Sequence, residues 1–126
     1  MDDVLAETRR LISADKVSGT TVYNKAGDAI GEVYDVMIDK ATGKVAYAVL
    51  SFGGFLGMGE KYHPLPWSLL KYQPAQGGYV VDLSKKQLEG APAYDAGADP
   101  DWENRNYEEK IYGYYGAPPY WIGIMP

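Results

Sequence analysis

The pattern of apolar and polar positions divides the chain into three parts. In residues 1–12 the apolar side chains recur at helical spacing, with Arg9 and Arg10 on the other side, which predicts a short amphipathic helix. Over residues 13–95 the apolar positions alternate or run together in short stretches bounded by turn-forming residues, which is typical of strands. Residues 96–126 are rich in acidic and aromatic side chains, and we interpret them as a C-terminal extension.

Residues 29–39 predict a long strand with an irregularity near its middle. Val36 and Ile38 are apolar but fall out of phase with Val33, because side chains alternate between the two faces of a strand. A bulge near Tyr34-Asp35 would restore the register and bend the strand, as a small barrel requires.

Residues 45–52 are almost entirely apolar, which is typical of a strand covered on both faces. A hairpin loop over residues 39–44 precedes it, with Gly43 placed to take a positive φ. We expect one face of this central strand to line the core. The other face would be covered by a terminal segment or by a partner.

Several shorter elements follow. We expect a strand at residues 61–63 that Pro64 stops, a tight turn at Trp67, and two more strands at residues 71–72 and 78–83 that close the sheet. Further along, Ser84 and Gln87 fit a capping box, with Leu88 as the apolar anchor of a single helical turn that Gly90 ends. Asp99-Pro100 predicts the start of a helix near residues 100–111, followed by an extended aromatic tail.

Composition narrows the functional classes. A chain of 126 residues fits one domain, and without cysteine a disulfide framework is excluded. A net charge of −5 disfavours binding to a phosphate backbone, so we expect no nucleic-acid partner. No apolar run approaches the roughly 20 residues that span a bilayer, and the acidic start does not fit a signal peptide, so we expect a cytoplasmic protein.

Four short motifs stand in a fixed order along the chain. They are residues 27–39, residues 42–45, the glycine-rich Gly53-Gly54-Phe55-Leu56-Gly57, and Leu65-Pro66-Trp67-Ser68-Leu69. In this order they resemble the PRC-barrel family, which is named after the reaction-centre H subunit and shares its barrel with a ribosome maturation factor. The resemblance covers about residues 13–95. It implies an all-β fold, a small half-open barrel of about six short strands. Outside the resemblance, the residue pattern predicts short helical N- and C-terminal extensions.

Candidate catalytic and metal-binding residues are few. His63 would need Ser51 or Ser68 and an orienting acid beside it to act in catalysis, and we interpret it instead as a surface or rim residue. Three aspartates, Asp28, Asp35 and Asp39, could be read as a cation site, but their spacing fits no calcium loop. We interpret them as turn-forming and bulge-stabilising residues, and expect neither a metal nor a cofactor.

The glycine-rich loop over residues 53–59 carries three apolar side chains, Phe55, Leu56 and Met58. They are either folded over one end of the barrel or exposed for a partner, and the sequence does not choose between the two. A phosphate-binding loop is disfavoured because no lysine followed by serine or threonine and no helix follows.

Members of this family are docking modules more often than enzymes, so the resemblance implies a non-catalytic adaptor that binds protein. The doubly apolar strand over residues 45–52 and the aromatic surplus of the tail predict that it also binds itself, most simply as a homodimer. The alternative is a regulatory module that binds a small molecule or metal ion at the barrel mouth. The tail aromatics fit packing against the barrel or a second subunit better than stacking on a single nucleic-acid strand. The candidate partner-binding residues are Phe55, Leu56, Met58, Tyr112, Tyr115, Tyr120 and Trp121.

Overall fold

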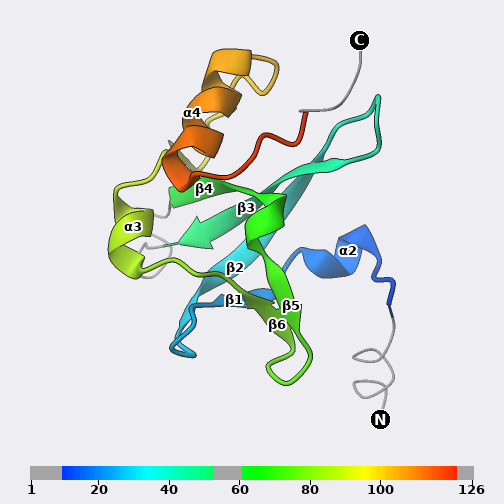
Figure 1. Cartoon of the computed structure of the whole chain (residues 1–126), viewed down its shortest axis with the longest axis vertical. Helices are drawn as coiled ribbons and strands as arrows, with labels where there is room; N and C mark the ends of the chain where they lie inside the picture. Colours follow the sequence, from blue (N-terminus) through cyan, green and yellow to red (C-terminus); the bar gives the residue numbers. More distant parts are fainter. Residues whose placement is uncertain (1–9, 53–60, 122–126) are drawn as a thin grey trace.

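The computed structural model of the chain describes residues 10–52 and 61–121 (Figure 1). Within these ranges one mixed sheet is formed in the strand order β5-β6-β1-β2-β3-β4-β7, which confirms the all-β class. All neighbouring strands run antiparallel except β1 and β6, which are parallel. The sheet is open at β5 and β7. The strands are β1 (Thr21–Tyr23), β2 (Ala29–Ile38), β3 (Val45–Phe52), β4 (Lys61–Pro66), β5 (Lys71–Gln73), β6 (Gly78–Val80) and β7 (Tyr94–Asp95).

The N-terminal helix expected over residues 1–12 stays a prediction, because the structure describes only its last three residues. Residues 1–9 lie outside the described residues, and residues 10–12 are not helical. The first described helix is the single turn α2 (Ala14–Val17), which buries Val17 in the core. Leu11 is 75% exposed and does not belong to the core.

The expected bulge in β2 is confirmed. The pairing of β2 with β3 shifts register between Val33 and Asp35, so that Val33 pairs with Leu50 and Asp35 with Val49. The Asp35 carboxylate accepts a hydrogen bond of 2.8 Å from the backbone N–H of Val36, next to the bulge. The bend lets the sheet curl around its inner core.

Strand β3 is central and buried on both faces, as its apolar sequence predicts. Its Ala48 and Leu50 join the inner core formed by the curled sheet together with Leu88. Ala46 and Tyr47 join a second cluster with the C-terminal extension. Of the two covers that the sequence allowed, the chain's own terminal segment is the one observed.

Strand β4 corrects the expectation that Pro64 ends the strand. It continues to Pro66, and its register with β3 runs unbroken from Lys61 to Pro66. Strand β7 pairs only with Lys61 and Tyr62, so both prolines lie on the part of β4 beyond β7. Proline is tolerated at such an edge because its missing N–H need not serve a neighbouring strand. The 3-10 helix η1 (Trp67–Leu69) then forms the predicted turn, with Trp67 half-buried against the inner core.

Two further helices follow the strands. The predicted capping box is confirmed in α3 (Lys85–Glu89), where Ser84 and Gln87 exchange hydrogen bonds and Leu88 is fully buried. Helix α4 (Arg105–Tyr115) corrects the prediction of a helix near 100–111, because its N-cap is Asn104 and not Asp99. The Asn104 side chain accepts a hydrogen bond of 2.9 Å from the Asn106 N–H.

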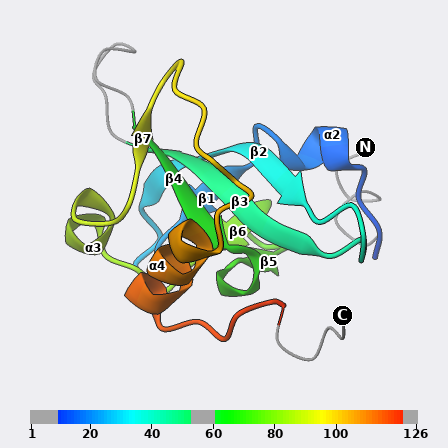
Figure 2. The same cartoon turned by 90° about the horizontal axis from the view of Figure 1, so that it is seen from above.

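Helix α4 lies beside β3 and β4 on the side of β3 that faces away from the inner core (Figure 2). Ile111 is fully buried there and Tyr112 is 3% exposed. The Tyr112 hydroxyl donates a hydrogen bond of 2.6 Å to the Ala46 carbonyl on β3. The C-terminal extension is therefore an integral layer of the fold over residues 100–121, held by its aromatic side chains.

Candidate functional site

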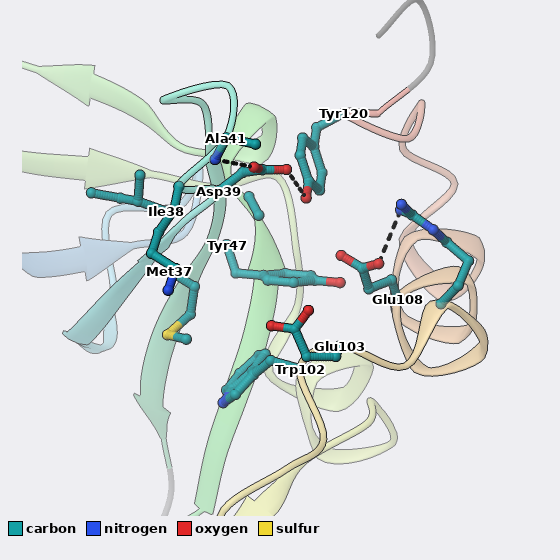
Figure 3. A pocket seen from close by; sticks show the side chains of 12 residues that line it. Met37, Ile38, Asp39, Ala41, Tyr47, Trp102, Glu103, Glu108 and Tyr120 are labelled. Carbon is teal, nitrogen blue, oxygen red and sulfur yellow. Dashed lines mark hydrogen bonds and ion pairs between the residues drawn. The ribbon is translucent and has the colours of Figure 1, made fainter. Parts of the chain in front are cut away.

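A pocket of about 590 Å³ lies between the β2–β3 hairpin and the C-terminal extension (Figure 3). The end of β2, the hairpin loop and the start of β3 form one wall. The segment before α4, the first turns of α4 and the tail form the other. The pocket is lined by Met37, Ile38, Asp39, Lys40, Ala41, Ala46, Tyr47, Trp102, Glu103, Arg105, Glu108 and Tyr120.

Asp39 joins the two walls. One carboxylate oxygen accepts hydrogen bonds from the backbone N–H groups of Ala41 at 2.9 Å and Thr42 at 3.3 Å, which confirms its predicted role in the turn. The other oxygen accepts a hydrogen bond of 2.9 Å from the Tyr120 hydroxyl. These donors, the Tyr120 hydroxyl above all, lower the pKa of Asp39, so it stays ionised near neutral pH.

Tyr47 carries a buried hydroxyl that has no partner among the described residues. The residue is 2% exposed, and its hydroxyl forms no hydrogen bond within the described part of the chain. Its ring packs against Trp102 and Tyr112, with centroids 5.6 and 5.5 Å away. Burial, reinforced by the nearby Glu108 charge, raises the pKa of Tyr47, so the phenol is neutral. An unpaired buried hydroxyl is costly, and here it borders a pocket.

Glu108 supplies a buried carboxylate to the same pocket. It is 7% exposed and forms an ion pair of 2.9 Å with Arg105 one turn earlier on α4. Burial raises the pKa of Glu108, and the charges of Asp39 and Glu103 act in the same direction, while Arg105 opposes them. The Arg105 guanidinium also lies 4.1 Å from the ring centre of Trp121, which fixes it by a cation–π contact.

The candidate partner-binding residues from the sequence take different places. Tyr120 lines the pocket, and Trp121 supports Arg105 beside it. Tyr112 is a buried anchor of α4, and Tyr115 is half-buried and packs against both core clusters. Phe55, Leu56 and Met58 lie outside the described residues, so their role stays a prediction.

No sequence pattern marks Tyr47, Trp102, Glu103 or Glu108 as site residues. Tyr47 sits within an apolar strand, where a tyrosine is indistinguishable from a core residue. The two glutamates lie in a generally acidic segment. Only the folding of the extension onto β3 brings these residues together, and the one available signal was the concentration of aromatic residues after Tyr94.

His63 corrects the expectation of a surface residue, because it is 2% exposed. Its ring packs edge-on against Phe52 with centroids 5.5 Å apart, and its Nδ1 has no hydrogen-bond partner among the described residues. Burial lowers the pKa of His63, so the ring is neutral at physiological pH. Residues 10–52 and 61–121 hold no group of three histidine, cysteine, aspartate or glutamate residues suited to a metal ion. None of the helices in these residues is long and apolar enough to cross a bilayer.

Comparison with known proteins agrees with the fold. The family model described as PRC-barrel domain matches residues 10–88. The chain is also similar to an uncharacterized protein of Deinococcus radiodurans, with 26% identity over 93 residues. The match covers 74% of this chain but 33% of that relative, so the chain spans about a third of the relative's length.

Proposed function

Because the chain belongs to the PRC-barrel domain family, we propose that it is a non-catalytic adaptor that binds another protein at the pocket beside the β2–β3 hairpin. The proposal rests on two features of the pocket. An apolar side chain is exposed on its rim, and a buried hydroxyl inside it has no hydrogen-bond partner among the described residues. Ile38 on the rim is 50% exposed, and the Tyr47 hydroxyl inside lacks a partner. A partner protein would bury the Ile38 side chain and supply a hydrogen bond to the Tyr47 hydroxyl.

The titratable groups of the pocket support binding rather than catalysis. Asp39 already accepts three hydrogen bonds, and Glu108 is paired with Arg105. Tyr47 is held neutral by burial. General acid–base catalysis favours a pKa near the working pH, which the directions of the Asp39 and Tyr47 shifts oppose. The pKa of Glu108 is shifted the other way, but its carboxylate is already paired with Arg105.

The proposal includes self-association, on support that differs from the expectation drawn from the sequence. The second face of β3 is covered by α4 of the same chain, so this face is not free to bind a second copy. What remains as support is a set of exposed apolar side chains, namely Leu11, Ile12, Tyr34 and Ile38. Such residues favour an interface between copies, most simply with two-fold symmetry.

A small-molecule regulatory module is the second candidate function. The pocket volume of about 590 Å³ favours it, because ligand sites in proteins commonly measure roughly 300–1,000 Å³. A thermal shift with a metabolite panel separates the two candidates. A ligand that raises the melting temperature by several degrees at sub-millimolar concentration favours the regulatory module.

We expect Ile38→Glu to remove a specific protein from the set captured by the purified chain in its native extract. A charge at a half-exposed rim position leaves the core intact but opposes burial of that rim against a partner. The matched control is Lys85→Glu, which places the same negative charge at an exposed position of α3 that does not line the pocket. The captured protein is then purified and its affinity for all three chains measured. Equal affinity for the wild type and Ile38→Glu would place the docking surface elsewhere.

A further inference from the structure

We propose that the pocket is a binding site for a primary alkylammonium group, either a lysine side chain presented by the partner or a free aliphatic amine. The lysine form rests on the proposed adaptor function, whereas the amine form does not. The inference is carried by the oxygen atoms, the balance of charge and the aromatic and apolar walls of the pocket.

Three oxygen-bearing side chains converge at one place. The Tyr47 hydroxyl points toward the gap between the carboxylates of Glu103 and Glu108 (Figure 3). That hydroxyl is deeply buried and has no hydrogen-bond partner among the described residues. An alkylammonium group has three N–H donors and no acceptor. It therefore matches three acceptor oxygens and would satisfy the one that the chain leaves open.

The charges around this place favour a cation. Three carboxylates line the pocket, those of Asp39, Glu103 and Glu108, against the two cationic side chains of Lys40 and Arg105. Arg105 is already engaged by Glu108 and by the ring of Trp121. The exposed Glu103 has no ion-pair partner among the described residues. An entering ammonium group thus meets a carboxylate that is not yet neutralised.

The walls fit the rest of such a ligand. Trp102 and Tyr120 supply aromatic rings, whose faces attract a cation that is losing its water. Met37, Ile38 and Ala46 supply apolar surface on the β2–β3 side, against which the methylene groups of a lysine can pack. A hard metal ion is a poorer match, because Ca²⁺ takes six to eight oxygen ligands.

We expect 1,5-diaminopentane and a lysine peptide with blocked ends to bind the full chain saturably in calorimetry at low salt. Tyr47→Phe and Glu103→Gln should each weaken this binding by about tenfold or more, because each removes an acceptor from the cation. The matched controls are Tyr115→Phe, which removes a second unpartnered buried hydroxyl, and Glu109→Gln, which neutralises an exposed carboxylate on α4. Neither control residue lines the pocket, so both variants should bind as the wild type does.

Stability separates a binding role for Tyr47 from a structural one. Both Tyr→Phe variants lose an unsatisfied buried hydroxyl, so both should melt at or above the temperature of the wild type. Only Tyr47→Phe should also lose amine binding. Tetramethylammonium, which has no N–H donor, should bind at least about tenfold more weakly than the primary amines.

Two results would overturn the inference. One is the absence of saturable binding at amine concentrations about tenfold above a Kd of roughly 1 mM. The other is equal binding by the wild type, Tyr47→Phe and Glu103→Gln. A diamine that binds far more tightly than the lysine peptide would support the ammonium site but assign it to a free amine. Loss of amine binding alone would leave the adaptor proposal standing, because the Ile38→Glu comparison tests that separately.

Discussion

Gly31→Val is expected to destabilise the fold by about 3 kcal/mol or more, a large share of the roughly 5–15 kcal/mol that stabilises a typical domain. Gly31 lies in β2 where it pairs with Val22 of β1. A Cβ atom there would stand 2.3 Å from the Ser51 carbonyl oxygen and 2.9 Å from Leu50 Cδ1. The first neighbour is backbone of the central strand and cannot move without breaking the sheet. Chemical denaturation followed by far-UV circular dichroism measures the loss.

Two other glycines provide controls for this prediction. Gly43 in the hairpin loop has a φ of +78°, and a Cβ atom added there would meet no atom within 4 Å. Gly43→Val should therefore cost on the order of 1–3 kcal/mol of folding stability through backbone strain alone. Gly113 lies within α4 with nothing near it, so Gly113→Ala should be neutral or stabilise by about 0.5–1 kcal/mol. If Gly31→Val melts like the parent, the close approach of β2 to β3 is wrong.

Ending the chain at residue 99 is expected to lower the melting temperature strongly and to make the remaining sheet associate. The truncation removes the fully buried Ile111 and the nearly buried Tyr112, and it exposes Ala46 and Tyr47 on β3. Each large side chain returned to water forfeits about 1.5–3 kcal/mol, so the total is several kcal/mol. Differential scanning calorimetry and sedimentation velocity, run on both chains at equal concentration, measure the two effects.

A point variant separates the hydrogen bond from the burial of the ring. Tyr112→Phe keeps the ring contact with Tyr47 but removes the bond of 2.6 Å to the Ala46 carbonyl. We expect a cost of about 1 kcal/mol of folding stability, or somewhat more because the carbonyl is left unpaired.

A truncated chain that keeps both the melting temperature and the mass per particle of the full chain would show that the extension contributes nothing to the fold.

Local rules explain which parts of the fold the sequence predicts. The bulge at Tyr34-Asp35, the burial of both faces of residues 45–52, and the capping box at Ser84 each follow from side chains a few positions apart. Asp99-Pro100 is a good helix-start signal and therefore predicts a helix near residues 100–111, whereas α4 begins at Arg105. The Asn104 side chain caps the helix instead, and residues 100–104 form turns. Local signals name candidate caps, and packing selects among them.

The candidate site depends on contacts that no local rule supplies. The Tyr120 hydroxyl meets Asp39 across 81 residues of chain, and the Tyr112 hydroxyl meets Ala46 across 66. The sequence left open whether a terminal segment or a partner covers β3, and this choice decides whether Tyr47 is a surface, interface or pocket residue. The aromatic surplus in residues 96–126 predicted packing of the extension. It did not predict which strand the extension would cover.

Photo-crosslinking from position 38 in the native cell shows whether a protein binds at this pocket. A photoreactive amino acid replaces Ile38 on the rim of the pocket, and in a parallel strain it replaces Lys85, which is exposed on α3 and does not line the pocket. We expect a discrete adduct with another protein from position 38 that is absent from position 85. If the bound ammonium group is a lysine of the partner, Glu103→Gln also weakens this adduct. No adduct from position 38, or the same adducts from both positions, would contradict the claim that this pocket binds a protein partner.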